Sequence, residues 1–171
     1  MQLVKYIFTF LIAFLIGFVI FAPKEKLYYL LEDRLQKEGF IIAKEEIVTT
    51  PTTILIKHPK LYYQGANIAT ALDIKLQTLL FYNKLTLEGF EPQSILKDQF
   101  PIEIKDATAL YTILNPLKVI IKAKGNFGEI EGYYNIKEKL IHLDITKPKD
   151  LAPIKPLLKK GKKGWYYEQR F

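Results

Sequence analysis

The chain has 171 residues, of which 49% are hydrophobic and 25% charged, and this balance excludes an intrinsically disordered protein. Cysteine is absent, so a disulfide framework, a thiol nucleophile and a zinc site built from thiolates are excluded as well. The net charge of +7 is unevenly placed: residues 6–146 carry 16 basic and 16 acidic side chains, whereas residues 147–171 carry eight basic and two acidic ones, a net of +6. We do not expect the body to bind nucleic acid, because such surfaces need clustered basic residues across the domain.

The N-terminal segment is strongly apolar. Seventeen residues from Tyr6 to Ala22 carry no charge, and as a helix they would span roughly 26 Å, close to the hydrocarbon thickness of a bilayer. A cleaved signal peptide is the alternative, but the run is longer than the apolar region of such peptides. Cleavage after Ala22 is also disfavoured, because Ile20 is bulky where a small residue is needed and Pro23 follows the cut directly. We therefore predict a retained single-pass membrane anchor over residues 1–23, with these helix positions in the bilayer: Tyr6, Phe10, Phe14, Phe18 and Ala22.

Residues 24–171 form the predicted body. Basic residues lie on both sides of the anchor and give no clear orientation, so the short N-terminal tail sets the prediction, with the body outside the cytoplasm. Within residues 24–39, leucines recur at helical spacing and Gly39 suits a helix C-cap, which predicts a short amphipathic helix.

From Phe40 onward the hydrophobic residues repeat every second position, which is typical of antiparallel strands with one face in water. The fold class predicted is mainly β, a curled antiparallel sheet of about eight or nine strands after the helix. Strands are predicted in 72–77, 102–105, 118–124, 129–134 and 141–146, with further candidates in 40–48, 53–57, 61–64 and 84–90, and a closing strand is predicted in 165–170. Residues 150–171 form a basic tail with a one- or two-turn helix possible in 150–160, then a glycine loop and the final strand.

One side of this sheet is predicted to be apolar. If the register follows the alternation, ten side chains share that side: Leu72, Ile74, Leu76, Ile102, Ile104, Val119, Ile121, Ile141, Leu143 and Ile145. Either the sheet curls until these side chains fill their own core, which we expect, or an apolar strip stays open and implies a lipid or a hydrophobic partner.

Catalytic groups are sparse. Ser94 is the only serine and has no nucleophile motif around it, and His58 and His142 have no companion ligands at metal spacing. We therefore expect no enzyme, no cofactor and no metal. Aromatic doublets such as Tyr133-Tyr134 are explained by pairing across strands, or alternatively by a groove for a lipid or protein.

The basic tail is predicted to contact an acidic surface, either anionic lipid headgroups or a partner's acidic patch, and a merely solvated tail is the alternative. The contacting residues would be Lys159, Lys160, Lys162 and Lys163.

Taken in order, these features resemble a known group of proteins. An anchor precedes LYYLLEDRLQKEGFIIAKEEI, then NIATALDIKLQTLLFYNKLTLEGFEP, the turn GNFGEIEGYYNI and a tyrosine-rich end. The order is similar to that of the type II secretion system protein N group and the wider AsmA-like envelope proteins. A single-pass anchored lipopolysaccharide-transport component is a second, less similar comparison.

The resemblance implies a non-enzymatic protein of the bacterial inner membrane with its C-terminal domain in the periplasm. Its expected role is a structural or docking component of a secretion or transport machine, with other envelope proteins as partners. The alternative is a lipid-binding or lipid-transfer module with an apolar β-trough.

Overall fold

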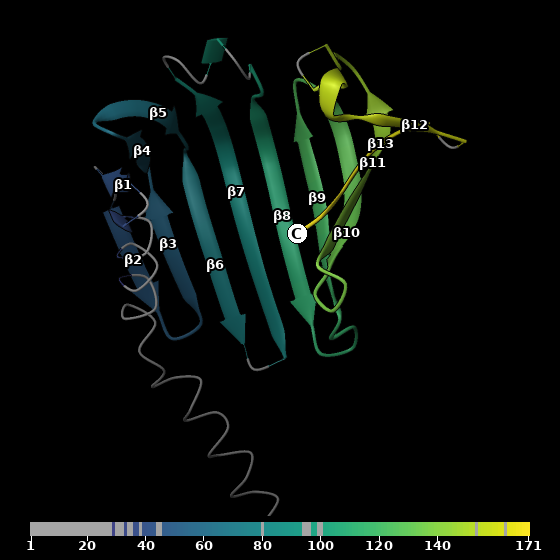
Figure 1. Ribbon diagram of the computed structural model, residues 1–171. Helices are drawn as coiled ribbons and strands as arrows, with labels where there is room; N and C mark the ends of the chain where they lie inside the picture. The colour runs from purple at the N-terminus through teal and green to yellow at the C-terminus, as the bar shows by residue number, and fades with distance from the viewer. Residues whose placement is uncertain are drawn as a thin grey trace, which may run out of the picture.

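The computed structural model describes residues 29, 33, 36–37, 39–43, 46–79, 81–93, 97–98, 101–152, 154–162 and 164–171 (Figure 1). The predicted anchor over residues 1–23 lies outside them, as does most of the predicted helix over residues 24–39. In the described part of the chain, no helix has the length and hydrophobicity needed to cross a membrane.

Four residues of the segment before the sheet are described and have helical backbone: Tyr29, Asp33, Gln36 and Lys37. Lys37 Nζ lies 2.7 Å from an oxygen of Asp33, one helical turn away. Gly39 has a φ of +87° and donates its N–H to the carbonyl of Gln36 at 3.0 Å, as a glycine that ends a helix does.

The described residues form one open antiparallel sheet of thirteen strands. The strands are β1 (Phe40–Ala43), β2 (Glu46–Thr50), β3 (Thr53–Lys57), β4 (Lys60–Tyr63), β5 (Ala66–Thr70), β6 (Asp73–Leu79), β7 (Tyr82–Pro92), β8 (Ile104–Thr112), β9 (Lys118–Gly125), β10 (Gly128–Asn135), β11 (Leu140–Pro148), β12 (Lys159–Gly161) and β13 (Gly164–Arg170). A single short 3-10 helix, η1 (Lys155–Leu157), stands between β11 and β12 in this part of the chain. The main path of neighbouring strands is β1-β4-β5-β7-β8-β9-β10-β11-β13-β12. A branch leaves this path at β7: β6 pairs with the same edge of β7 as β5 does, then β3 pairs with β6 and β2 with β3.

The shorter N-terminal strands are halves of longer, bent ones. The pairing of β1 with β4 and of β2 with β3 follows one register, from Phe40 opposite Tyr63 to Thr50 opposite Thr53. Likewise β5 and β6 pair with β7 in one register on either side of the bend. The bends fall at neighbouring places, where His58 and Gly89 have φ angles of +51° and +62°. Hence β1, β4 and β5 fold out of the plane of β2, β3 and β6, and we call these three strands the corner sheet (Figure 1).

The sheet is curled. Figure 1 shows its two edges, β1–β3 on one side and β10–β13 on the other, standing forward of the central strands β6–β9. Bulges in the pairing of β8 with β9 and of β10 with β11 add to the natural twist of the strands. The predicted class, a mainly β protein with an antiparallel sheet, is therefore confirmed.

Several element predictions need correction. The sheet has thirteen strands, not eight or nine, and the strand predicted over 40–48 is divided between β1 and β2. β5 and β12 were not predicted as strands, and β8 continues to Thr112, well past the predicted 102–105. The short helix considered for 150–160 is confirmed as η1, with a proline in its first turn.

Candidate binding trough

The register places two rows of uncharged and mostly apolar residues on the concave face. The first row crosses eight strands through the pairs Ile47, Ile56, Ile74, Leu87, Ala107, Ala123, Ile130 and Ile145. The second row crosses nine strands through Thr49, Ile54, Leu76, Leu85, Ala109, Ile121, Gly132, Leu143 and Tyr167. Directly paired residues project to the same side of a sheet, so each row lies on one face. Neither row contains a charged side chain.

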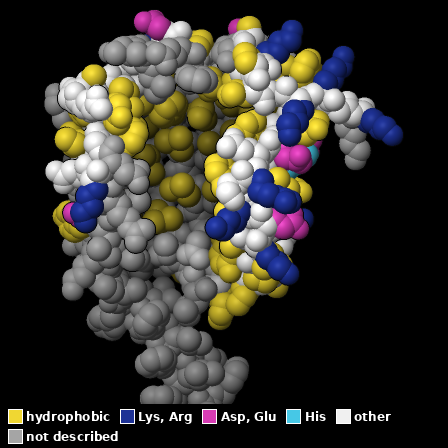
Figure 2. Space-filling model, in the orientation of Figure 1, with side chains coloured by type: hydrophobic (Ala, Val, Ile, Leu, Met, Phe, Trp, Pro, Cys, Tyr) yellow, Lys and Arg dark blue, Asp and Glu magenta, His cyan; other side chains and the backbone are white. Residues whose placement is uncertain are grey.

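The concave face is open between its two walls. On the β3 wall, Ile54 and Ile56 are buried, with exposed fractions of 3% and 8%. Leu85, in the middle of the second row, is 42% exposed, and most of its neighbours are half-buried. Figure 2 shows the result, a hollow lined by hydrophobic side chains between the two walls. We call this hollow the trough.

The expectation of a mostly self-filled core is therefore wrong for the described residues. The central floor residues are small, namely Ala107, Ala109, Ala123 and Gly132, and they do not reach across to fill the space between the walls. The curl brings the walls into facing positions without bringing their side chains together.

One end of the trough is narrowed by the corner sheet. Between the corner sheet and β6–β7 is a pocket of about 90 Å³. Its lining is almost wholly apolar and consists of Ile42, Pro59, Leu61, Ala69, Thr70, Ala71, Ile74, Leu87 and Phe90.

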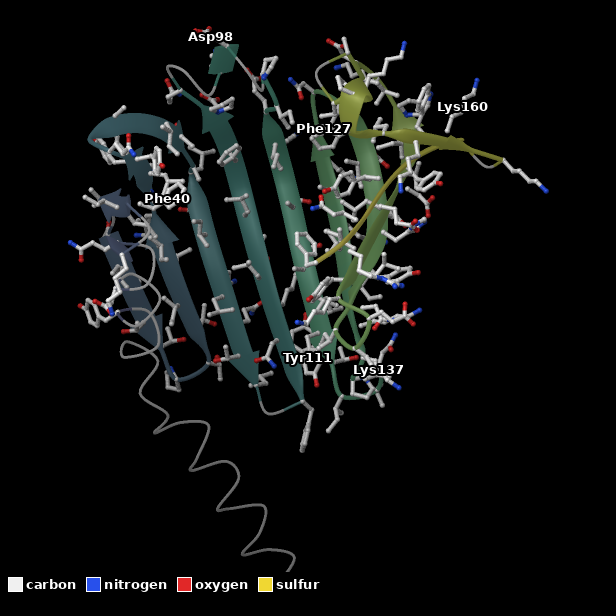
Figure 3. All side chains as sticks on the ribbon, viewed as in Figure 1. Phe40, Asp98, Tyr111, Phe127, Lys137 and Lys160 are labelled. Carbon is white, nitrogen blue, oxygen red and sulfur yellow. The ribbon has the colours of Figure 1, made fainter. Side chains whose placement is uncertain are left out.

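The same end is filled on the opposite wall by a cluster around Phe127. Phe127, Ile145 and Ile154 are buried there, and Ile102, Ile104 and other partly buried apolar residues pack against them. Ile154 belongs to the segment after β11, so its burial beside Phe127 shows that this segment folds back over this end. Figure 3 shows Phe127 at this end of the sheet.

The convex face is polar and faces water. Lys122 pairs with Glu131 at 3.0 Å, and Glu129 pairs with Lys124 at 3.4 Å and with Lys147 at 3.0 Å. The hydrogen bond from Lys147, then the nearby positive charges, lower the pKa of Glu129 below its usual range despite some desolvation. Such exposed pairs contribute little to the stability of the fold, because water and salt screen them.

His142 lies on this polar face. Its Nδ1 is 3.0 Å from Glu168 and its Nε2 is 3.4 Å from Asp144. The ring stands between those of Tyr133 and Tyr166, at centroid distances of 5.8 Å and 5.3 Å. These contacts hold the His142 ring in place on the convex face. The described residues contain no group of three or more His, Cys, Asp or Glu side chains placed to hold a metal ion.

The predicted apolar face is largely brought together. Seven of its ten residues lie on the concave face: Ile74, Leu76, Val119, Ile121, Ile141, Leu143 and Ile145. Ile102 and Ile104 join the cluster around Phe127. Leu72 differs, because it lies at the bend between β5 and β6, outside the strands, with 58% of its surface exposed.

The other predicted positions are divided between described and undescribed residues. The anchor positions Tyr6, Phe10, Phe14, Phe18 and Ala22 lie outside the described part, as does Lys163. Lys159, Lys160 and Lys162 are exposed on β12 and its turn. Lys159 is 3.8 Å from Glu168, and Lys160 lies 5.9 Å from the Trp165 ring centroid.

Trough residues that the sequence reasoning missed lie in the centre and on the β3 wall: Ile54, Ile56, Leu85, Leu87, Ala107 and Ala109. The alternation in 84–90 carried a usable signal for Leu85 and Leu87. The β8 alanines carried none, because small residues contrast weakly with threonine and aspartate.

Together these features define an open, curled antiparallel sheet with an apolar concave face and a polar convex face. Comparisons with protein-family models, with curated proteins and with solved structures find no match to this chain.

Proposed function

We propose that this domain is a non-enzymatic lipid-binding module that holds acyl chains in the trough. The observation that supports this most directly is the absence of charge from two rows of side chains that cross the sheet on a face left partly open. An exposed apolar surface of that length is costly in water and is typical of a binding surface.

The dimensions suit an acyl chain. Strands are spaced about 4.8 Å apart, so the second row follows an arc of roughly 38 Å across nine strands. This arc runs around the curl, across the strands, so it is the width of the apolar face, and an acyl chain would lie along the strands between the two walls. Small floor residues leave room for a ligand, and the walls supply branched aliphatic side chains.

In a cell, the module would be held at a bacterial inner membrane by the predicted anchor, with its trough in the periplasm. This placement follows from the sequence pattern and from the resemblance to the AsmA-like and type II secretion system protein N groups.

A second candidate is a docking component of an envelope secretion or transport machine. It is favoured by β12, a three-residue strand at the edge of the sheet in which all residues are exposed and two are lysines. An acidic partner could approach this edge without entering the trough.

Site-specific photocrosslinking of the full chain in cells tests the proposal. A benzophenone side chain at Leu85 should crosslink to lipid, identified by mass spectrometry of the purified adduct. The matched control is Thr86, the next residue of β7, which projects to the convex face and should give no lipid adduct. Protein adducts at Leu85 in place of lipid would refute the lipid-binding function and favour docking.

A further inference from the structure

Large apolar side chains are exposed on three turns at one end of the sheet. These turns join β6 to β7, β8 to β9 and β10 to β11. Their exposed fractions range from 43% to 93%, and the residues are Leu79, Phe81, Ile113, Leu114, Leu117 and Ile136. We call this group the apolar tip.

The three turns are hydrogen-bonded to one another. Ile113 donates its backbone N–H to the Phe81 carbonyl at 3.0 Å, and Ile136 donates to the Leu117 carbonyl at 2.9 Å. The tip is therefore one contiguous surface, and not three independent loops. Figure 3 places Tyr111 and Lys137 at this end of the sheet and Asp98 and Phe127 at the opposite end.

Turns at the opposite end have a different character. The β4–β5 turn is formed by Gln64 and Gly65, and the β9–β10 turn by Asn126 and the buried Phe127. These two described turns carry no exposed leucine or phenylalanine, in contrast to the three turns of the apolar tip. Leu114, the most exposed of the six at 93%, has no fold-stabilising burial to account for it.

The charges around the tip are mainly positive. Residues 79–84, 111–119 and 134–140 contain four lysines and one acidic residue, Glu138. Lys118 and Lys137 directly follow the exposed apolar residues Leu117 and Ile136. Aliphatic and aromatic side chains with lysines beside them are the composition of surfaces that enter the interface of an anionic bilayer.

We infer that the apolar tip docks into the headgroup region of a membrane that contains anionic lipid. The apolar side chains enter the boundary between headgroups and acyl chains, and the lysines contact lipid phosphates. The predicted anchor keeps the domain within reach of such a surface. Docking at the tip does not depend on what the trough holds, and the two are tested separately.

The absence of cysteine allows a direct test with the full chain. Single variants Leu114→Cys, at the tip, and Asp98→Cys, exposed at the opposite end, are labelled with an environment-sensitive fluorophore. Each is reconstituted into vesicles of equal parts phosphatidylcholine and phosphatidylglycerol. Quenching by nitroxide-labelled lipid chains reports contact with hydrocarbon, and quenching by iodide reports contact with water.

The label at Leu114→Cys should shift its emission to the blue, be quenched by nitroxide lipid and be protected from iodide. The label at Asp98→Cys should show the reverse. Adding Phe81→Asp and Leu117→Asp should abolish lipid quenching at position 114 without changing the circular dichroism spectrum, since both side chains are more than half exposed.

Two results would overturn the inference. Equal iodide quenching at positions 114 and 98 means that the tip stays in water. Protection from iodide without quenching by nitroxide lipid means that a protein, for example a second copy of the chain, covers the tip. Lipid crosslinking at Leu85 is read independently, so the trough and the tip can each fail alone.

Discussion

Aspartate substitutions at Leu85 and Ile54 should separate folding from lipid binding. Both residues lie in the second row of the trough, and Leu76 pairs with both. Leu85 is 42% exposed and Ile54 is 3% exposed. If the trough is open, Leu85→Asp places a carboxylate that keeps its contact with water, whereas Ile54→Asp places one in a dry cluster.

The magnitudes follow from burial. Burying a whole leucine is worth about 1.5–3 kcal/mol, and Leu85 is a little more than half buried, so its loss costs about 1–2 kcal/mol. Ile54→Asp loses the full burial and adds several kcal/mol for an unpaired buried carboxylate. Its total of at least ~5 kcal/mol is comparable to the whole stability of many domains, about 5–15 kcal/mol.

Urea titration of the full chain in detergent micelles, followed by circular dichroism, measures both effects. Leu85→Asp should remain folded and lose co-purifying lipid, and Ile54→Asp should be unfolded or nearly so. Thr86→Asp on the convex face is the control and should leave stability and lipid almost unchanged. If Leu85→Asp unfolds the protein as completely as Ile54→Asp, the centre of the trough is covered and the reasoning is wrong.

Three further predictions concern β10, the outer face and the tail. Gly132→Val should lower the unfolding free energy by about 1–3 kcal/mol, since an added Cβ would lie 2.7 Å from Leu143 Cα. An unchanged urea midpoint would contradict the close packing of β10 on β11. The pKa of Glu129 is lowered in the folded state. The ionised carboxylate therefore stabilises the fold above the pKa of the unfolded chain, and this contribution is lost as the pH falls through the pKa of the folded state. The melting temperature should drop less on acidification in Glu129→Gln than in the unaltered protein. Replacing Lys159, Lys160, Lys162 and Lys163 with glutamine should weaken binding to acidic surfaces and reduce its salt dependence, whereas an unchanged salt slope would mean that the tail is not involved.

The apolar face was predictable because each strand carries its own two-residue period. Val119 and Ile121 stand between Lys118 and Lys122 with one break at Ile120. Ile141 and Leu143 alternate with His142 and Asp144. The correct pairing then follows almost automatically in a sheet whose consecutive strands are joined by short turns.

The bends and bulges were harder to predict, although one bend and one bulge interrupt the two-residue period of the sequence. After Leu85 and Leu87 the next large apolar residue of β7 is Phe90, so the period slips by one at Gly89, where φ is +62°. Ile104 and Ala107 show the same slip across the bulge between β8 and β9. Treated as signals, these slips would have located the bend and the bulge.

The openness of the trough could not be read from the sequence at all. Alternation states which side of a strand is apolar, but the distance between opposite walls depends on twist and bulges summed over many strands. The β8 segment DATALYT offered little contrast between its faces, so one central strand of the floor was hard to recognise in the sequence.

The up-and-down order of the strands gives the sheet a nearly one-dimensional character. From β8 to β11 each strand pairs only with its two neighbours along the path, and among the described residues the sheet ends at β1, β2 and β12. As in repeat proteins, stability then accumulates through nearest neighbours, and unfolding can start at either edge while the centre persists. Amide hydrogen exchange should therefore be slowest in β7–β9 and accelerate toward both edges. A trough built in this way can loosen one wall to admit or release a ligand while its floor remains folded.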